Sequence, residues 1–221
     1  MHLGLAAAGT LAIILLTALL LALAGRISYW QAWVFAGLNE ALVLMTAIRF
    51  RSETGAIRER MRFGSASVWW DRLFLALFMP MNLAVIVLAG LDGGRLHLGP
   101  EPPLPLYVAC CIFYPCGAYL HLWAVGSNSS YVGTVCIREG QRVIDAGPYR
   151  WIRHPGYAGI IVMMSSIAIL LGSVAALLPA GIVALLVIAR TALEDRMLRR
   201  GLEGYAGYAE RVRYRLVPWV W

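Results

Sequence analysis

The chain alternates between long apolar runs and short polar segments that are rich in arginine. Several runs approach the roughly 20 residues that an α-helix needs to cross a hydrocarbon core of about 30 Å. This pattern predicts transmembrane helices. We expect four of them before the last apolar run, over residues 3–25, 30–48, 73–91 and 104–125.

The last apolar run, residues 157–189, is too long for a single transmembrane helix. At 1.5 Å per residue it would measure roughly 50 Å, well beyond the bilayer core. Gly172 and Ser173 interrupt the run near its middle, and Pro179 follows. We therefore expect a helical hairpin with two legs of about 15 residues each.

Aromatic and basic residues follow the hairpin, which is typical of an amphipathic helix at a membrane surface. Hydrophobic residues make up 60% of the 221 positions and charged residues only 14%, which excludes an ordinary soluble domain. The predicted fold is an all-α integral membrane protein with about four transmembrane helices, a C-terminal hairpin and an amphipathic C-terminal helix. The C-terminal aromatic and basic residues are Tyr205, Tyr208, Arg211, Arg213, Tyr214, Arg215, Trp219 and Trp221.

The sequence contains no internal repeat and no linker long enough to separate two domains. We expect one domain over residues 1–221. Its N-terminal spans lie in residues 1–125, and a polar segment, the hairpin and the C-terminal helix lie in residues 126–218.

All 19 basic residues are arginine, and their distribution predicts a topology. Six fall within residues 49–72, four within 138–153 and seven within 190–215, whereas only Arg26 and Arg95 fall in the alternate loops. The positive-inside rule then predicts that both termini and the two long polar loops are cytoplasmic. That topology needs an even number of crossings, which the hairpin supplies.

The net charge of +7 is explained by this topology and by contact with anionic lipid headgroups. No helix-turn-helix, zinc finger or aromatic-interleaved basic segment indicates nucleic-acid binding. The cysteines form no Cys-x-x-Cys pair, so we expect no metal site and no disulfide framework. They are Cys110, Cys111, Cys116 and Cys136.

A polar turn, residues 147–157, opens directly into the hairpin. Pro155 disfavours a helical conformation at His154 and suits the first position of a helix, so we expect a helix to begin at Pro155 and Gly156. The N-terminal amides of that helix suit a carboxylate or phosphate, and Arg153 and His154 flank the same point. These residues could equally cap the helix and anchor it among lipid headgroups.

A second polar cluster follows the hairpin, with Arg190 and Glu194 one helical turn apart and Asp195 beside them. Taken alone, Arg190 and Glu194 form an ordinary surface ion pair worth about 0.5 kcal/mol. The hairpin, however, would return this cluster to the same membrane face as Arg153 and His154. The two clusters could then form one pocket.

The order and spacing of these motifs resemble the isoprenylcysteine carboxyl methyltransferase family, and related membrane phospholipid methyltransferases share parts of the pattern. The resemblance covers residues 126–218, and Ile57-Arg58-Glu59-Arg60 and Asp71-Arg72 also resemble a cytoplasmic loop of bacterial members. The motifs are Gly147-Pro148-Tyr149, Arg153-His154-Pro155-Gly156-Tyr157, Arg190-x-x-x-Glu194, Tyr205-x-x-Tyr208 and Arg213-x-Arg215-Leu216-x-Pro218.

The resemblance implies a membrane methyltransferase that binds S-adenosylmethionine in a cytoplasm-facing pocket made by the hairpin and the preceding loop. It implies Arg190 as the residue facing the acceptor substrate, and the family's eukaryotic members often have paired glutamates where this chain has Glu194 and Asp195. The residues that correspond to cofactor contacts are Gln141, Val143, Ile144, Tyr149, His154, Pro155, Gly156, Tyr157 and Glu194.

The chemistry of the acceptor remains open between two classes. A carboxylate is already nucleophilic and needs only an arginine to hold it, for which Arg190 and Arg153 are the candidates. An amine needs a proton removed, which makes Glu194 or His154 a candidate base. We expect a lipophilic acceptor, most simply the carboxylate of an isoprenylcysteine-like lipid, with a phospholipid or other lipid amine as the alternative.

Two other classes of function remain, an NADPH-dependent membrane reductase and a non-catalytic scaffold. The all-arginine basicity and the bacterial style of the loop indicate a prokaryotic inner membrane. Asn39 and Glu40 lie near the middle of the second span, where they could line an acceptor tunnel or form a structural hydrogen bond to Asn82 or His121. The sequence does not indicate an oligomeric state.

Overall fold

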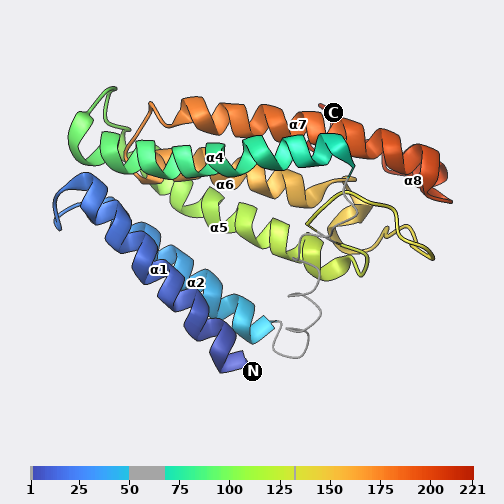
Figure 1. The fold of residues 1–221 in the computed structure, drawn as a ribbon, viewed down its shortest axis with the longest axis horizontal. Helices are drawn as coiled ribbons and strands as arrows, with labels where there is room; N and C mark the ends of the chain where they lie inside the picture. Colours follow the sequence, from blue (N-terminus) through green and yellow to red (C-terminus); the bar gives the residue numbers. More distant parts are fainter. Residues whose placement is uncertain (1, 50–67, 132) are drawn as a thin grey trace.

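A computed structural model describes residues 2–49, 68–131 and 133–221 of the chain (Figure 1). The resemblance at Ile57-Arg58-Glu59-Arg60 lies outside these residues. Within them, every regular element is helical, which confirms the predicted all-α fold. The α-helices are α1 (His2–Ala24), α2 (Trp30–Arg49), α4 (Trp69–Leu91), α5 (Leu104–Ser127), α6 (Pro155–Leu170), α7 (Leu177–Gly201) and α8 (Tyr205–Arg211).

Five of the described helices, α1, α2, α4, α5 and α7, are long and apolar enough to cross a membrane, which confirms an integral membrane protein. A π-helical turn, η1 (Asp92–Leu96), extends α4, and a 3-10 turn, η2 (Gly147–Arg150), precedes α6. The four predicted N-terminal spans correspond to α1, α2, α4 and α5.

The predicted hairpin is present as α6 and α7, and α6 begins at Pro155 as expected. The expected leg length is right for the 16 residues of α6 and wrong for the 25 residues of α7. Helix α7 continues through the second polar cluster to Gly201, because that segment is rich in strong helix formers such as Leu, Arg, Glu and Met. Pro179 lies in the first turn of α7, where a missing N–H leaves no hydrogen bond unmade.

The C-terminal helix is shorter than its sequence predicted. Helix α8 ends at Arg211, and its aromatic residues Tyr205 and Tyr208 are buried against the protein instead of facing a membrane. Beyond it the chain folds back on itself, since the N–H groups of Arg215 and Leu216 donate to the carbonyl oxygen of Trp221. The terminal tryptophans therefore lie outside any helix.

The helices run back and forth between two ends of the molecule (Figure 1). At one end the short connections contact one another: Arg26 donates to the carbonyl oxygen of Gly93, and Ser173 donates to Asp92 at 2.5 Å. The polar segment 128–154, the start of α4 and the end of α7 lie at the other end. Arg26 and Arg95 are thus separated from the other described arginines, as the charge distribution predicted.

Helices α5 and α6 pack with their backbones in close approach at two glycines. A Cβ atom at Gly159 would lie 2.5 Å from the carbonyl oxygen of Gly117 and 2.9 Å from the amide nitrogen of His121. Small residues at a helix crossing allow this contact within a membrane. The crossing fixes the start of α6 against the end of α5, and the pocket described below lies between these two helix ends.

The intramembrane polar residues have different partners from those expected. Asn39 accepts a hydrogen bond from Tyr114 at 2.7 Å, and Glu40 accepts one from Thr10 at 2.9 Å. Neither contact involves Asn82, which donates to a carbonyl of its own helix, or His121, which donates to Gly156. The predicted hydrogen bond to Asn82 or His121 is therefore wrong, and Tyr114 and Thr10 are the partners instead.

Candidate active site

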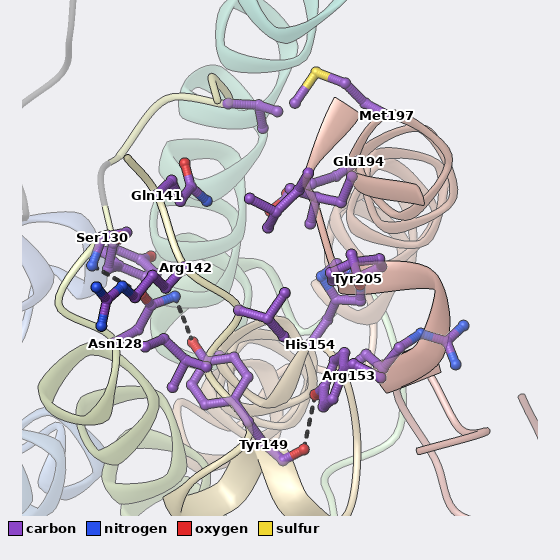
Figure 2. A pocket seen from close by; sticks show the side chains of 18 of the residues that line it. Asn128, Ser130, Gln141, Arg142, Tyr149, Arg153, His154, Glu194, Met197 and Tyr205 are labelled. Carbon is purple, nitrogen blue, oxygen red and sulfur yellow. Dashed lines mark hydrogen bonds between the residues drawn. The ribbon is translucent and has the colours of Figure 1, made fainter. Parts of the chain in front are cut away.

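A pocket opens between the end of α5, the irregular segment 128–146, η2 and the start of α6, and the end of α7 with α8 (Figure 2). Its volume is roughly 840 Å³ including the open mouth. The described part of segment 128–146 forms no helix, as its glycines predicted, so its backbone groups are available to a ligand.

Tyr149 forms part of the pocket wall and is fixed from three directions. Its hydroxyl donates to the carbonyl oxygen of Ala124 at 3.3 Å and accepts a hydrogen bond from Asn128 at 3.5 Å. Its own carbonyl oxygen accepts a hydrogen bond from the Tyr208 hydroxyl at 2.7 Å. Helices α5 and α8 are thereby tied to the 3-10 turn that precedes α6.

His154 caps the N-terminus of α6 and is almost fully buried. Its backbone N–H donates to the carbonyl oxygen of Arg215, and its ring stacks in parallel with that of Tyr157, with centroids 5.7 Å apart. The Nε2 atom has no hydrogen-bond partner among the described residues and lies 3.6 Å from Asp195. The Nε2 atom therefore faces the buried carboxylate of Asp195.

Glu194 supplies the acidic group of the pocket. Its Oε2 atom accepts a 2.5 Å hydrogen bond from the hydroxyl of Tyr157, which joins α7 to α6 across the pocket. No described residue donates to Oε1. The pocket therefore contains a carboxylate oxygen that can accept a hydrogen bond from a cationic ligand.

Arg190 lies behind Tyr157 and does not line the pocket. Its guanidinium is held between two rings, 4.4 Å from the centroid of Phe74 and 5.3 Å from that of Tyr157. One terminal nitrogen lies 2.8 Å from the fully buried carboxylate of Asp71 and donates to the carbonyl oxygen of Gly133. Its Nε–H is buried without a partner among the described residues.

Arg153 lines the pocket and is held by four hydrogen bonds from its guanidinium group. Its guanidinium donates to Asp195 at 2.7 and 3.2 Å and to the carbonyl oxygens of Val212 and Arg213. Because these bonds use all three guanidinium nitrogens in a buried site, Arg153 holds the C-terminal segment against α7. Arg153 also lines the pocket, so its role in binding an acceptor stays a prediction.

Asp195 is the centre of this ion-pair network. Besides Arg153, it accepts hydrogen bonds from Arg215 at 3.0 Å, Arg199 at 3.3 Å and Tyr205 at 3.0 Å. The carboxylate is fully buried, so this many donors offset the cost of its burial. The substitution of aspartate for the second glutamate of the resembled motif thus falls on the residue that joins α6, α7, α8 and the C-terminal segment.

The structure brings eight of the nine predicted cofactor-binding residues to the pocket wall. Pro155 is buried at the first position of α6 and is the exception. The eight are Gln141, Val143, Ile144, Tyr149, His154, Gly156, Tyr157 and Glu194.

Sequence reasoning missed several lining residues and the partner of Arg190. Asn128 and Tyr131 line the pocket from the loop after α5, and only their closeness to the polar segment could have indicated them. Tyr205 and Tyr208 were assigned to a membrane surface but line the pocket instead. Asp71, in the first turn of α4, carried no local signal of pairing with Arg190.

The lining combines aromatic rings, one carboxylate, the guanidinium groups of Arg142 and Arg153, and several neutral polar groups. This suits a ligand that carries both positive and negative groups on a ring-containing body. Burial raises the pKa of Tyr131 to about 12, so its hydroxyl stays neutral near pH 7. Among the described residues, no group of three or more His, Cys, Asp or Glu could hold a metal ion.

Residues 106–203 match the sequence profile of the phospholipid methyltransferase family. The matched stretch is somewhat less than half of the chain and contains the polar segment, the hairpin and all nine predicted cofactor-binding residues. The match supports a membrane methyltransferase and does not separate enzymes that act on isoprenylcysteine from enzymes that act on phospholipids. No curated protein sequence matches the chain.

Proposed function

We propose that this protein is an S-adenosylmethionine-dependent methyltransferase that acts on a lipophilic acceptor at the cytoplasmic face of a prokaryotic inner membrane. The observation that carries the proposal is the pocket in which Glu194, His154 and a set of tyrosine rings face one cavity. The match of residues 106–203 to a methyltransferase family supports it independently.

The residues present fit the chemical groups of this cofactor. The open oxygen of Glu194 would hold its ammonium group, and the rings of Tyr131, Tyr149 and Tyr157 would surround its positively charged sulfur by cation–π contact. The N–H of Gly156 would donate to its carboxylate, since Pro155 has no N–H and the next two N–H groups of α6 donate to the carbonyl oxygen of His154. When bound, the cofactor supplies an activated methyl group, so the protein has mainly to align the acceptor.

An amine headgroup is the acceptor that the charges favour. Arg190 is already neutralised by the buried carboxylate of Asp71, and an acceptor carboxylate would have to compete with that ion pair. An amine would need a base, and His154 is the candidate, because the two oxygens of Glu194 are used by Tyr157 and by the cofactor's ammonium group. The description of the matched family, whose enzymes methylate phospholipids, supports the same class.

A carboxylate acceptor remains the second candidate because of one observation. The Nε–H of Arg190 is buried and has no partner among the described residues, so it could donate to an acceptor carboxylate. In that case Arg190 would hold the acceptor through Nε while Asp71 kept its terminal nitrogen in place. The two candidates predict opposite changes in the KM for the acceptor when Asp71 loses its charge.

The placement at the cytoplasmic face rests on charge. The pocket lies at the end of the molecule that holds most of the described arginines, while Arg26 and Arg95 lie at the opposite end. The positive-inside rule assigns the arginine-rich end to the cytoplasm, where a water-soluble methyl donor is available.

Calorimetry on the detergent-purified protein tests the proposal. We expect micromolar binding of S-adenosylmethionine and no binding of NADPH. Glu194→Gln should weaken binding about 10- to 100-fold, because a hydrogen bond to a charged group contributes about 1.5–3 kcal/mol. Glu203→Gln, which changes an exposed carboxylate outside the pocket, serves as the matched control. Binding of NADPH in place of the methyl donor would overturn the proposal in favour of a reductase.

A further inference from the structure

A second concave surface lies at the seam between α4 and α7, on the other side of Met197 from the cofactor pocket. We call it the α4–α7 groove. Its apolar walls come from Trp70, Ile137 and Leu193, and its volume is roughly 670 Å³ including the open side. Gly201 lets the loop approach α7 here, since a Cβ atom at that position would lie 2.6 Å from Ile137 Cδ1.

Two exposed arginines, Arg196 and Arg200, line the groove one helical turn apart. Neither forms an ion pair with another residue in the described part of the chain. Their neighbour Arg199, by contrast, pairs with Asp195 at 3.3 Å. Among the described residues, the groove therefore presents two positive charges without a counter-ion beside an apolar wall, which is the complement of an anionic amphiphile.

The apolar surface of α7 leads to these arginines. A stripe of exposed residues follows one face of the helix at intervals of three and four, and it ends at Arg196 and Arg200. Trp69, which is exposed at the start of α4, is typical of the membrane–water interface and lies at the same end of the molecule. The stripe consists of Leu178, Ile182, Leu185, Ala189 and Leu193.

We propose that the α4–α7 groove binds one bilayer phospholipid, with its phosphate on Arg196 and Arg200 and an acyl chain along the stripe. Paired guanidinium groups match the phosphate oxygens, and basic pockets between transmembrane helices on the cytoplasmic side are suited to lipid headgroups. The lipid headgroup would lie against Met197, which also lines the cofactor pocket. This binding site does not depend on methyl transfer.

Native mass spectrometry of the full chain in detergent, titrated with dioleoyl phosphatidylglycerol, tests the proposal. We expect one saturable phospholipid adduct, which Arg196→Gln/Arg200→Gln weakens about tenfold or more. Arg150→Gln/Arg213→Gln removes the same charge from exposed positions outside the groove and should leave the adduct unchanged. Dioleoylglycerol, which has the same acyl chains and no phosphate, should form no saturable adduct.

Equal weakening by both double variants would overturn the proposal, because general surface charge would then explain the binding. A saturable adduct with dioleoylglycerol would overturn it as well. Calorimetry with S-adenosylmethionine on the same samples keeps the two proposals apart. If the unaltered protein forms the phospholipid adduct but does not bind S-adenosylmethionine, the result counts against the proposed function alone. If Arg196→Gln/Arg200→Gln leaves the adduct unchanged, the result counts against the groove alone.

Discussion

At the scale of residues, two buried aspartates organise the arginines that the sequence singled out. Asp195 holds Arg153 and thereby joins the start of α6 to the C-terminal segment, while Asp71 holds Arg190 from α4. Both carboxylates are fully buried, so each depends on its partners for stabilisation. The division of roles follows from this pairing: Arg153 supports the pocket wall, and Arg190 lies one layer behind Tyr157.

Asp195→Asn should destabilise the protein strongly. Loss of this carboxylate leaves Arg153 buried without a counter-ion, which costs about 3–5 kcal/mol. Arg199→Gln is the control, because its half-exposed ion pair with the same carboxylate contributes at most about 0.5 kcal/mol. The thermal unfolding midpoint in detergent checks the difference, and equal midpoints for the two variants would contradict the central role of Asp195.

Asp71→Asn should change acceptor use while leaving the affinity for S-adenosylmethionine unchanged, since Asp71 does not line the cofactor pocket. Removal of its charge leaves Arg190 positively charged and unneutralised. The KM for an amine acceptor should then rise about tenfold, because the cation repels it, whereas the KM for a carboxylate acceptor should fall. Steady-state kinetics with each acceptor measures the direction of the change in KM.

Asp145→Asn is the control for this experiment, because the exposed ion pair of Asp145 with Arg211 lies away from Arg190. A KM that changes equally in both variants would show that Asp71 acts only through the net charge of the protein, and not through Arg190.

At the scale of elements, the hairpin positions both halves of the site. Helix α6 could be predicted at its start, because a proline after His154 restricts the backbone locally. The end of α7 could not be predicted in this way. The end of an apolar run indicates where a helix leaves the membrane, but the helix itself can continue beyond that point. The prediction that the C-terminal aromatic residues lie at the membrane surface was wrong for Tyr205 and Tyr208 for a related reason. Aromatic residues suit a lipid interface and a pocket wall equally well, and only tertiary packing decides between them.

Gly159→Ala should destabilise the α5–α6 crossing. The added Cβ atom would lie 2.5 Å from the carbonyl oxygen of Gly117, and a backbone atom cannot move aside cheaply. Gly181→Ala, in α7, meets nothing within 4 Å and should be neutral or stabilise the helix by up to about 1 kcal/mol. Unfolding midpoints and the affinity for S-adenosylmethionine check this, and an unchanged Gly159→Ala variant would contradict the close packing.

At the scale of the whole molecule, the separation of arginines predicts that the pocket end is cytoplasmic. In a variant without the native cysteines, Glu101→Cys in the exposed α4–α5 connection should react with a membrane-impermeant maleimide in intact cells. Glu203→Cys, between α7 and α8, should react only after the membrane is opened. The reverse pattern of labelling would contradict the proposed orientation.

The spans, the hairpin and most of the pocket wall could be predicted from the sequence. They follow from the lengths of the apolar runs, from the positions of proline and glycine, and from one polar turn. The sequence did not indicate the contacts that cross the fold, such as Asp71 with Arg190, because nothing near Asp71 marks its partner more than 100 residues away. It also did not indicate the ion pair of Arg153 with Asp195, because a charge near a pocket looks the same in sequence whether it faces a ligand or a buried carboxylate.

The most direct test is methyl transfer itself. The reconstituted protein should move the label of methyl-labelled S-adenosylmethionine into the lipid fraction of phosphatidylethanolamine-containing vesicles. Label on an amine resists mild alkali, whereas label in a carboxyl methyl ester is released as volatile methanol. We expect lipid label that stays non-volatile after alkali, even though alkali also cleaves the acyl esters of the lipid, and that is lost in Glu194→Gln and retained in Glu203→Gln. No lipid label from folded protein that binds S-adenosylmethionine, with phosphatidylethanolamine or with an isoprenylated cysteine, would contradict the proposed methyltransferase.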